Sequence, residues 1–227
     1  MCERMRLNLV NPTAKAYTEA SPFVQMGPFS KVIDSELVGN NFVGDFACFN
    51  RCRVGRYTGL SFCSYAADSE IGRFTTIGSR VSIGAFSHPT DWLSIHEFQY
   101  RDVSRIYGET LIDGGRNLLS STDRPTRLGN DVWVGDNAAI GRGVTIGDGA
   151  IIGLSAVVVS DVEPFSIVVG NPGRTLRKRF PDDIISALVD LKWWDSDLNH
   201  LHGINFKDIR SAIADLRTRQ LRVADGN

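Results

Sequence analysis

The sequence lacks any apolar run near the roughly 18 residues that a membrane-spanning helix requires, so we expect no membrane insertion. Its opening stretch, MCERMRLNLVNP, has charges but no apolar segment followed by a cleavage site, and no signal peptide is expected. Neither sign of charge is in excess: the formal net charge is −1, which gives no reason to expect nucleic acid as a partner. These absences favour a cytoplasmic location.

Cysteine is scarce, and its spacing argues against a metal site. The residues Cys2, Cys48, Cys52 and Cys63 form no C-x2-C pair and have no histidine nearby, so we expect no metal. We interpret Cys48, Cys52 and Cys63 as small apolar fillers in a reduced protein.

What the sequence does contain is a six-residue period. Aliphatic residues recur at Leu128, Val134, Ile140, Ile146, Ile152 and Val158. A second apolar series follows four positions later, at Val132, Ala138, Val144, Ala150, Ala156 and Val162. Helices repeat every three to four residues and strands every two. A fixed period of six therefore predicts a parallel β-helix, in which three hexads make one triangular coil.

The first residue of each hexad should point into the narrow prism, and the second is glycine in five successive hexads. We expect these glycines to occupy tight corners, where either a positive φ or a close backbone approach requires them. An earlier, ragged version of the repeat includes Val38, Val43 and Val54, which suggests loops or bulges in the early coils.

We predict three regions: an N-terminal extension over 1–34 that packs on the prism, a β-helix domain over 35–173, and a basic turn with helices over 174–227. The repeat stops over 85–127, where two histidines and several aromatic residues lie. An insertion of this length is usually functional or disordered. Its aromatic content predicts an ordered arm.

The C-terminal region combines cations with two amphipathic segments. A cluster of cations lies at its start and comprises Arg174, Arg177, Lys178 and Arg179. Pro181 should open one helix, and a second is expected from Asn205 to about Arg219. We expect these helices to cap the end of the prism and protect its open strand edges.

A family resemblance rests on four features: the hexads, the loop SHPTDW, the exit NPGR and the segment LKWWDSDL. Together they resemble the hexapeptide-repeat acyltransferases over about residues 70–205. The likeness is strongest to the xenobiotic acetyltransferase branch, which includes type B chloramphenicol acetyltransferases and related sugar O-acetyltransferases. The resemblance implies a left-handed β-helix and a homotrimer that binds acetyl-CoA in grooves between subunits.

The resemblance also implies that a histidine on the long loop is the general base, and the matching residue is His88. Histidine suits this task because its unperturbed pKa of about 6.5 lies near neutral pH. Its imidazole would take the proton of an acceptor hydroxyl, which then attacks the thioester carbonyl directly.

The cofactor groove is expected to contain small residues and exposed backbone groups, because the pantetheine arm is narrow and rich in amides. Gly141, Gly153 and Ser155 fit this description. The resemblance adds further acetyl-CoA contacts at Asp136, Leu154, Val159, Ser160, Arg174 and Arg177, with the arginines near the phosphates. Trp133 matches a tryptophan that flanks the groove or packs between subunits.

Acceptor binding is assigned to the arm residues Asp91, Trp92, His96 and Tyr100. The acceptor itself stays open: a sugar of a surface polysaccharide, an antibiotic hydroxyl, or the amine of an aminosugar nucleotide. A prism-shaped carbonic anhydrase would need three histidines, and only His88 and His96 fall in the prism portion. A non-catalytic solenoid scaffold would have no reason to carry the His88 arm.

Overall fold

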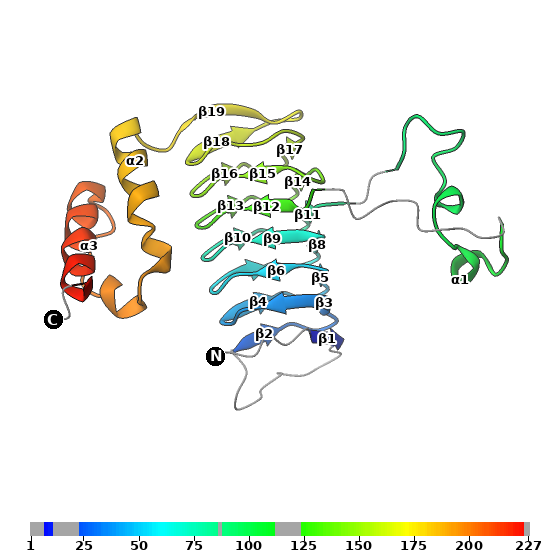
Figure 1. The fold of residues 1–227 in the computed structure, drawn as a ribbon, viewed down its shortest axis with the longest axis horizontal. Helices are drawn as coiled ribbons and strands as arrows, with labels where there is room; N and C mark the ends of the chain where they lie inside the picture. Colours follow the sequence, from blue (N-terminus) through cyan, green and yellow to red (C-terminus); the bar gives the residue numbers. More distant parts are fainter. Residues whose placement is uncertain (1–6, 11–22, 86–87, 112–123, 225–227) are drawn as a thin grey trace.

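The computed structural model describes residues 7–10, 23–85, 88–111 and 124–224. Triangular coils stack into a β-helix, the arm projects from one side of it, and the C-terminal helices lie along the other side (Figure 1). The expected mainly β prism is confirmed.

Each coil contributes a short strand to each of three faces. Face A consists of β1 (Leu7–Val10), the start of β3 (Lys31–Leu37), β5 (Cys48–Asn50), β8 (Tyr65–Ala67), β11 (Ser82–Ile83), β14 (Ala139–Ile140) and β17 (Val157–Val158). Face C consists of the end of β3, β6 (Arg53–Val54), β9 (Ser69–Ile71), β12 (Thr126–Leu128) and β15 (Thr145–Ile146). Face B consists of β2 (Val24–Met26), β4 (Asn41–Val43), β7 (Gly59–Leu60), β10 (Thr76–Ile77), β13 (Trp133–Val134), β16 (Ile151–Ile152), β18 (Ser166–Val169) and β19 (Arg174–Lys178).

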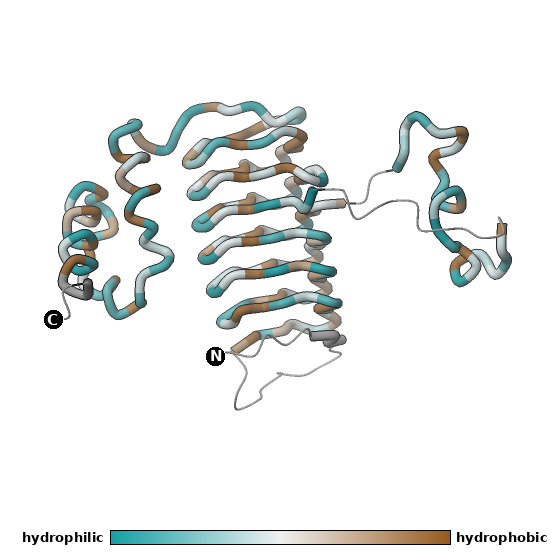
Figure 2. The backbone as a smooth tube through the Cα atoms, in the orientation of Figure 1, coloured by the Kyte–Doolittle hydropathy of each residue, from teal (hydrophilic) through white to brown (hydrophobic). Residues whose placement is uncertain are grey.

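The chain runs from face A to C to B and back to A, so the prism has an A/C, a C/B and a B/A corner. Strands on each face pair in parallel, except that β1 pairs with β3 and β19 with β18 in antiparallel fashion. Both apolar series of the hexads are buried. The same positions recur as apolar segments from coil to coil (Figure 2). Their burial is the main source of the prism's stability.

Coils before the arm are one residue shorter than the coils directly after it. Strand partners lie 17 residues apart before the arm, as from Gly59 to Thr76, and 18 apart directly after it, as from Trp133 to Ile151. The last coil is shorter, since Ile151 pairs with Ile167. In the coils before the arm, the shorter side is the one that turns the A/C corner. The ragged early spacing is therefore a regular, shorter coil, and the expected loops and bulges are not needed to explain it.

The hexad glycines are required for close packing. A Cβ on Gly135 would lie 2.7 Å from the backbone nitrogen of Leu154 in the next coil. The positive φ falls two residues later, at Asn137 with a φ of 59°. Of the two reasons expected for these glycines, close approach is correct and positive φ is wrong.

The boundaries of the prism differ from those expected. Strand β2 pairs in parallel with β4, so the first coil begins at Val24 and not at residue 35. In the next coil Leu37 is buried, whereas Val38 of the ragged pattern is exposed. After the arm, the prism resumes at Thr126, which pairs with Ser69.

The C-terminal helices pack along the C/B corner and do not cap the end of the prism. They are α2 (Asp182–Leu191), η2 (Trp193–Asp195), η3 (Leu198–Leu201) and α3 (Ile209–Ala224). Their buried side chains surround Phe165, and Trp193 contacts Phe74, which stacks on Tyr57. The last coil is instead covered by β19. The second helix starts at Ile209, later than expected.

The cysteines occupy unlike environments. Cys52 is buried, which raises the pKa of its thiol to about 12, and Cys48 is half-buried. Cys63 is exposed at the B/A corner, so its interpretation as an apolar filler is wrong, and Cys2 lies outside the described residues. Within the described residues no helix is long and apolar enough to span a membrane.

Candidate active site

The described part of the arm has a small core of its own. It contains the helical turns η1 (Glu97–Gln99) and α1 (Ser104–Tyr107). Tyr100 and Val103 are buried between these turns, and Arg101 forms an ion pair with Glu97 one turn earlier. The arm is therefore folded along residues 88–111, as its aromatic content predicts.

The imidazole of His88 is oriented by a backbone carbonyl. Its Nδ1 lies 2.7 Å from the carbonyl oxygen of Ile95. A carbonyl only accepts hydrogen bonds, so this contact selects the tautomer with the proton on Nδ1. Nε2 then carries the lone pair of the neutral ring. This is the protonation pattern that a general base needs.

Tyr100 is a second contact of the His88 imidazole. Its hydroxyl lies 2.9 Å from His88 Nδ1, and the two rings meet edge to face with centroids 6.2 Å apart. Tyr100 has 0% of its surface exposed, and this burial, with the nearby Glu97 carboxylate, raises the pKa of its hydroxyl. With the proton on Nδ1, the hydroxyl oxygen of Tyr100 accepts from the same N–H that faces the Ile95 carbonyl, and the neutral phenol holds the histidine in place. Tyr100 was expected to contact an acceptor, but its burial gives it no surface for one.

The other arm residues expected to bind an acceptor differ in position. Trp92 is exposed, with its ring 6.1 Å from that of Tyr100 and so close to the histidine. His96 caps η1 by accepting a hydrogen bond from the Phe98 amide, and its ring contacts Tyr107. Asp91 is exposed. Trp92 is the best placed of these residues to touch a molecule held at His88.

The arm begins and ends at the A/C corner, where ion pairs that the sequence pattern did not indicate join the coils to one another and to the end of the arm. Asp68 accepts hydrogen bonds from Arg142 at 3.0 Å and from Arg51 at 2.6 and 2.8 Å. Arg124, where the arm returns, binds both carboxylate oxygens of Asp161. Opposite charges brought together by residues far apart in sequence leave no periodic signal.

The residues expected to contact the cofactor fall into two groups, one at each edge of face A. Asp136, Gly153, Leu154 and Ser155 lie at the B/A corner, whereas Gly141, Val159 and Ser160 lie at the A/C corner beside the arm root. Leu154 and Val159 are the exposed aliphatic residues of the two groups. Within one chain, the full width of face A separates the group at the B/A corner from the group at the A/C corner.

Three of these residues have packing roles of their own. Asp136 accepts a hydrogen bond from the Ser79 amide at 2.8 Å, which braces the coil below. A Cβ on Gly153 would lie 2.9 Å from the side chain of Val169, and one on Gly141 would lie 3.3 Å from a backbone oxygen of the next coil. These two glycines are thus explained by coil stacking.

Trp133 and two arginines share face B. Trp133, Ile151, Ile167 and Arg177 are successive cross-strand partners, and Trp133 is exposed. A register shift between β18 and β19 also pairs Arg174 with Val169. Because cross-strand partners share a face, both arginines point to the same side as Ile167 and Val169.

The four cations of the cluster that begins the C-terminal region divide by role. Arg174 and Arg177 are exposed, and among the described residues neither makes an ion pair. Lys178 donates to the carbonyl of Pro164, and Arg179 pairs with Asp131 at 3.1 Å over the rings of Phe165 and Phe180. Of these four, only Arg174 and Arg177 are exposed and without an ionic partner among the described residues.

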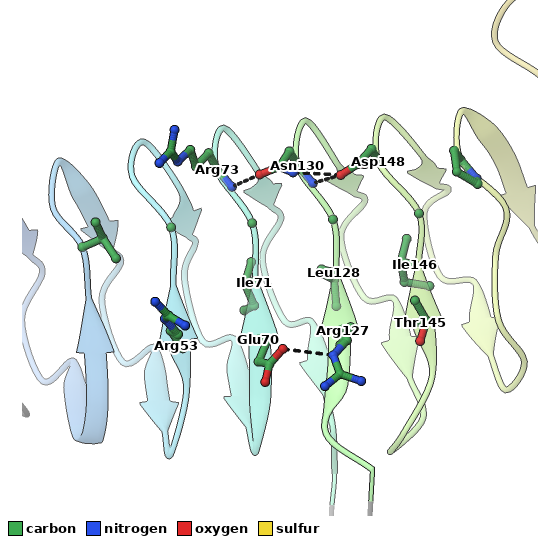
Figure 3. A pocket seen from close by; sticks show the side chains of 16 residues that line it. Arg53, Glu70, Ile71, Arg73, Arg127, Leu128, Asn130, Thr145, Ile146 and Asp148 are labelled. Atoms are coloured by element: carbon green, nitrogen blue, oxygen red, sulfur yellow. Dashed lines mark hydrogen bonds and ion pairs between the residues drawn. The ribbon is translucent and has the colours of Figure 1, made fainter. Parts of the chain in front are cut away.

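A hollow of about 550 Å³ lies elsewhere, on face C (Figure 3). Arg53, Glu70, Arg127 and Thr145 follow one another along it, and Arg127 pairs with Glu70 at 3.0 Å. None of the expected site residues lines this hollow. Nor do the described residues contain a group of three or more side chains that could hold a metal ion.

Comparison with known proteins agrees with this architecture. The family described as "Bacterial transferase hexapeptide (six repeats)" matches residues 125–159. A chloramphenicol acetyltransferase of Agrobacterium fabrum is 38% identical over 181 residues, 74% of this chain and 82% of that enzyme. A probable macrolide acetyltransferase of Lysinibacillus sphaericus is 53% identical over 70 residues, 31% of this chain and 39% of that protein.

A solved structure shares the fold. It is a variant of AntD, an N-acyltransferase from Bacillus cereus, in complex with dTDP-4-amino-4,6-dideoxyglucose and coenzyme A. The likeness covers 74% of this chain and 90% of that chain, with a TM-score of 0.52 and 18% identity.

A β-helix built from hexads, with a histidine-bearing arm at one corner, defines an enzyme of the hexapeptide-repeat type. This chain belongs to the hexapeptide-repeat acyltransferases, in the branch of the chloramphenicol and related xenobiotic acetyltransferases. It is an acyltransferase.

Proposed function

We propose that this protein is an acetyl-CoA-dependent O-acetyltransferase in which His88 is the general base. The observation that carries the proposal is the contact between His88 Nδ1 and the Ile95 carbonyl, because it leaves Nε2 as the basic nitrogen. A base held in one tautomer on a folded segment loses little freedom when it reacts.

The reaction is a direct transfer between two bound molecules. As the acceptor oxygen attacks the thioester carbonyl, its proton passes to Nε2 of His88, and the bond from carbon to sulfur breaks. The proton on the imidazolium then neutralises the departing thiolate. Base catalysis of this kind typically contributes about 10²–10⁴-fold to the rate.

The binding of acetyl-CoA is supported by the charges on β19. CoA carries a pyrophosphate and a 3′-phosphate, and guanidinium groups bind such anions through paired hydrogen bonds. Arg174 and Arg177 are exposed on one side of β19, above Trp133 on the same face. The guanidinium groups of Arg174 and Arg177 therefore suit the phosphates of acetyl-CoA.

The separation of the two groups of cofactor residues supports a groove between copies of the chain. A single elongated ligand would touch the B/A group and face B of one copy and the A/C group of the next. The arm leaves from the A/C corner and projects away from its own prism, as this arrangement needs (Figure 1). A cyclic homotrimer would contain three such grooves.

The acceptor is a small molecule with a reactive hydroxyl. The similarity to enzymes named for chloramphenicol and macrolides favours an antibiotic, and a sugar of a surface-polysaccharide precursor is the second candidate. An aminosugar nucleotide would make the product an amide. Trp92, exposed beside Tyr100, is placed to contact the acceptor.

A thiol-release assay tests the proposal. The protein is mixed with acetyl-CoA and panels of antibiotics, sugars and nucleotide sugars, and free CoA thiol is measured against a sample without acceptor. We expect acceptor-dependent release with a hydroxyl compound. Release with amines alone would replace O-transfer by N-transfer, and no release with any panel would contradict the proposal.

A further inference from the structure

The two contacts of the His88 imidazole come from residues at either end of the short helix η1. Nδ1 of His88 lies 2.7 Å from the carbonyl oxygen of Ile95, the residue just before the N-cap of η1. The same Nδ1 lies 2.9 Å from the hydroxyl of Tyr100, the C-cap of η1. Whatever stabilises η1 therefore also holds both partners of the histidine.

The start of η1 is closed by the side chain of His96. Its Nδ1 accepts a hydrogen bond from the Phe98 amide at 3.2 Å, and its backbone has the extended conformation of an N-cap. Such a side chain satisfies an amide that has no partner inside the helix. Because η1 contains only three residues, the cap is a large part of what holds it.

The peptide unit between Ile95 and His96 is held on both sides. Its carbonyl oxygen faces His88, and its N–H donates to the hydroxyl of Ser94 at 3.0 Å. The side chain of Gln99, the last residue of η1, donates to the Ser94 carbonyl. Since a peptide unit is planar, the hydrogen bond of its N–H also sets the direction of its carbonyl. The segment before η1 is thus folded back onto the helix.

We infer that neutral His96 is a positioning residue: by capping η1, it holds the Ile95 carbonyl and the Tyr100 hydroxyl against His88. The inference rests on the proposed function, in which His88 is the base. The effect of His96 on the reaction passes through η1, so it is an effect on the orientation and tautomer of the base.

The cap exists only while the imidazole of His96 is neutral. A ring nitrogen that accepts from an amide carries no proton, so the single ring proton of His96 lies on Nε2. In the imidazolium form both ring nitrogens are donors. Protonation of His96 therefore removes the hydrogen bond from the Phe98 amide and opens the start of η1.

The ring of His96 packs against aromatic side chains of η1 and α1. Its centroid lies 5.1 Å from that of Phe98 and 5.4 Å from that of Tyr107. These contacts hold the ring in place, whereas the cap depends on its protonation. The charged and titratable side chains on the two elements are Glu97, which pairs with Arg101, and Arg105 and Tyr107.

Two protonations should therefore stop the reaction on the acid side. Histidine is the side chain whose charge ordinarily changes between about pH 5 and 8. His88 must be neutral to accept a proton, and His96 must be neutral to cap η1. The acid limb of log kcat/KM against pH should be steeper than the loss of one proton, with a slope that approaches about 2.

Two variants separate the cap from the ring. His96→Asn keeps a capping acceptor that does not titrate, so kcat should stay within about twofold of wild type and the acid slope should fall to about 1. His96→Leu keeps apolar bulk without an acceptor and should lower kcat about 2–30-fold, the ratio by which loss of an N-cap shifts a local equilibrium. His202→Asn, at an exposed histidine of the C-terminal segment, is the control and should change neither value.

Equal losses in His96→Asn and His96→Leu would assign the ring to packing and overturn the inference. A wild-type slope of about 1 that His96→Asn leaves unchanged would overturn it as well. Circular dichroism confirms that each variant is folded.

Nitrogen NMR of the histidine rings tests the positioning without any substrate. Above neutral pH, the isotope-labelled full chain should show the proton of His88 on Nδ1 and that of His96 on Nε2. His88 should lose its single tautomer in His96→Leu and keep it in His96→Asn, because the hydrogen bond to one ring nitrogen sets which nitrogen is protonated. A His88 that keeps its proton on Nδ1 in His96→Leu would contradict the inference.

The two measurements separate the positioning role from the activity. If the wild type releases CoA thiol and His96→Leu changes neither turnover nor the His88 tautomer, the inference is wrong and the function stands. If His96→Leu releases the His88 tautomer while the wild type transfers no acyl group, the proposed function is wrong and the positioning stands.

Discussion

At the scale of single residues, the pair His88 and Tyr100 contains the least expected feature of the site. Tyr100 was expected at the acceptor, whereas it is buried and its hydroxyl lies beside Nδ1 of the histidine. No spacing rule links position 88 to position 100, because the arm folds irregularly between them. The sequence could therefore indicate the base but not its support.

Tyr100→Phe should lower kcat by about 2–10-fold, since a net hydrogen bond of this kind contributes about 0.5–1.5 kcal/mol. The KM for acetyl-CoA should not change, because the partner of the hydroxyl is His88 on the arm. Steady-state thiol release measures both constants. An equal loss with Tyr107→Phe, which removes an exposed hydroxyl elsewhere on the arm, would mean that general disturbance of the arm, and not the lost Tyr100 hydroxyl, causes the effect.

The Asp68 carboxylate predicts a pH effect on stability. Burial alone would raise the pKa of Asp68, but hydrogen bonding and charge from Arg51, with the charge of Arg142, lower it below its ordinary value. Because the folded-state pKa lies below the unfolded-state pKa of about 3.9, the ionised carboxylate stabilises the protein at pH values above about 3.9. This contribution is lost as the pH falls through the folded-state pKa.

Asp68→Asn should therefore lower the Tm at pH 7, and the difference from wild type should shrink as the pH falls below about 4. Thermal melts by circular dichroism at several pH values measure this. Asp183→Asn is a matched control, because Asp183 pairs with Arg210 at the surface. A difference for Asp68→Asn that does not change with pH would exclude the ion pair as its source.

At the scale of elements, the hexads predicted the prism well because each position has one dominant physical task. The inward aliphatic residues and the glycines are each selected by the stacking of one coil on the next. The 17-residue coils and the side-on helices were not predicted. A shorter corner shifts the phase of the period, and a helix pattern does not tell which surface the helix covers.

The glycines provide a test of coil stacking. A Cβ on Gly72 would lie 2.5 Å from the carbonyl group of Gly129, so Gly72→Ala should destabilise the protein by about 2–3 kcal/mol. Gly59 has space for a Cβ, 3.6 Å from Phe42, and Gly59→Ala should be neutral or slightly stabilising. Urea unfolding compares the two. Equal effects would contradict the assignment of these glycines to close packing.

Two arginines at the end of β19 and just after it should have separable roles, Arg177 in phosphate binding and Arg179 in stability. If Arg177 contacts the 3′-phosphate, Arg177→Ala should raise the KM for acetyl-CoA several-fold, and the KM for acetyl-dephospho-CoA should not change. Arg179→Ala should instead lower the Tm, because Arg179 pairs with the half-buried Asp131. A matching loss with both CoA forms would assign Arg177 to structure.

At the scale of the whole molecule, the three corners of the prism differ. The A/C corner carries the arm, the C-terminal helices cover the C/B corner, and the B/A corner exposes Phe29, Phe46 and Phe62. The rigid hexads hold the groups expected to bind the cofactor, whereas the chemistry is proposed at the arm, where the repeat is interrupted. The arm projects away from its own prism, so the proposed groove would be completed by a second copy (Figure 1). The periodicity of the hexads could not indicate this arrangement, because it specifies no partner; only the family resemblance implied grooves between subunits.

The most direct test of the central claim is acceptor-dependent thiol release by His88→Ala, with acetyl-CoA binding measured by calorimetry on the same sample. We predict a kcat lowered by about 10²–10⁴-fold and an unchanged Kd for acetyl-CoA, because the imidazole acts on the acceptor proton. His88→Ala with wild-type turnover would contradict the account.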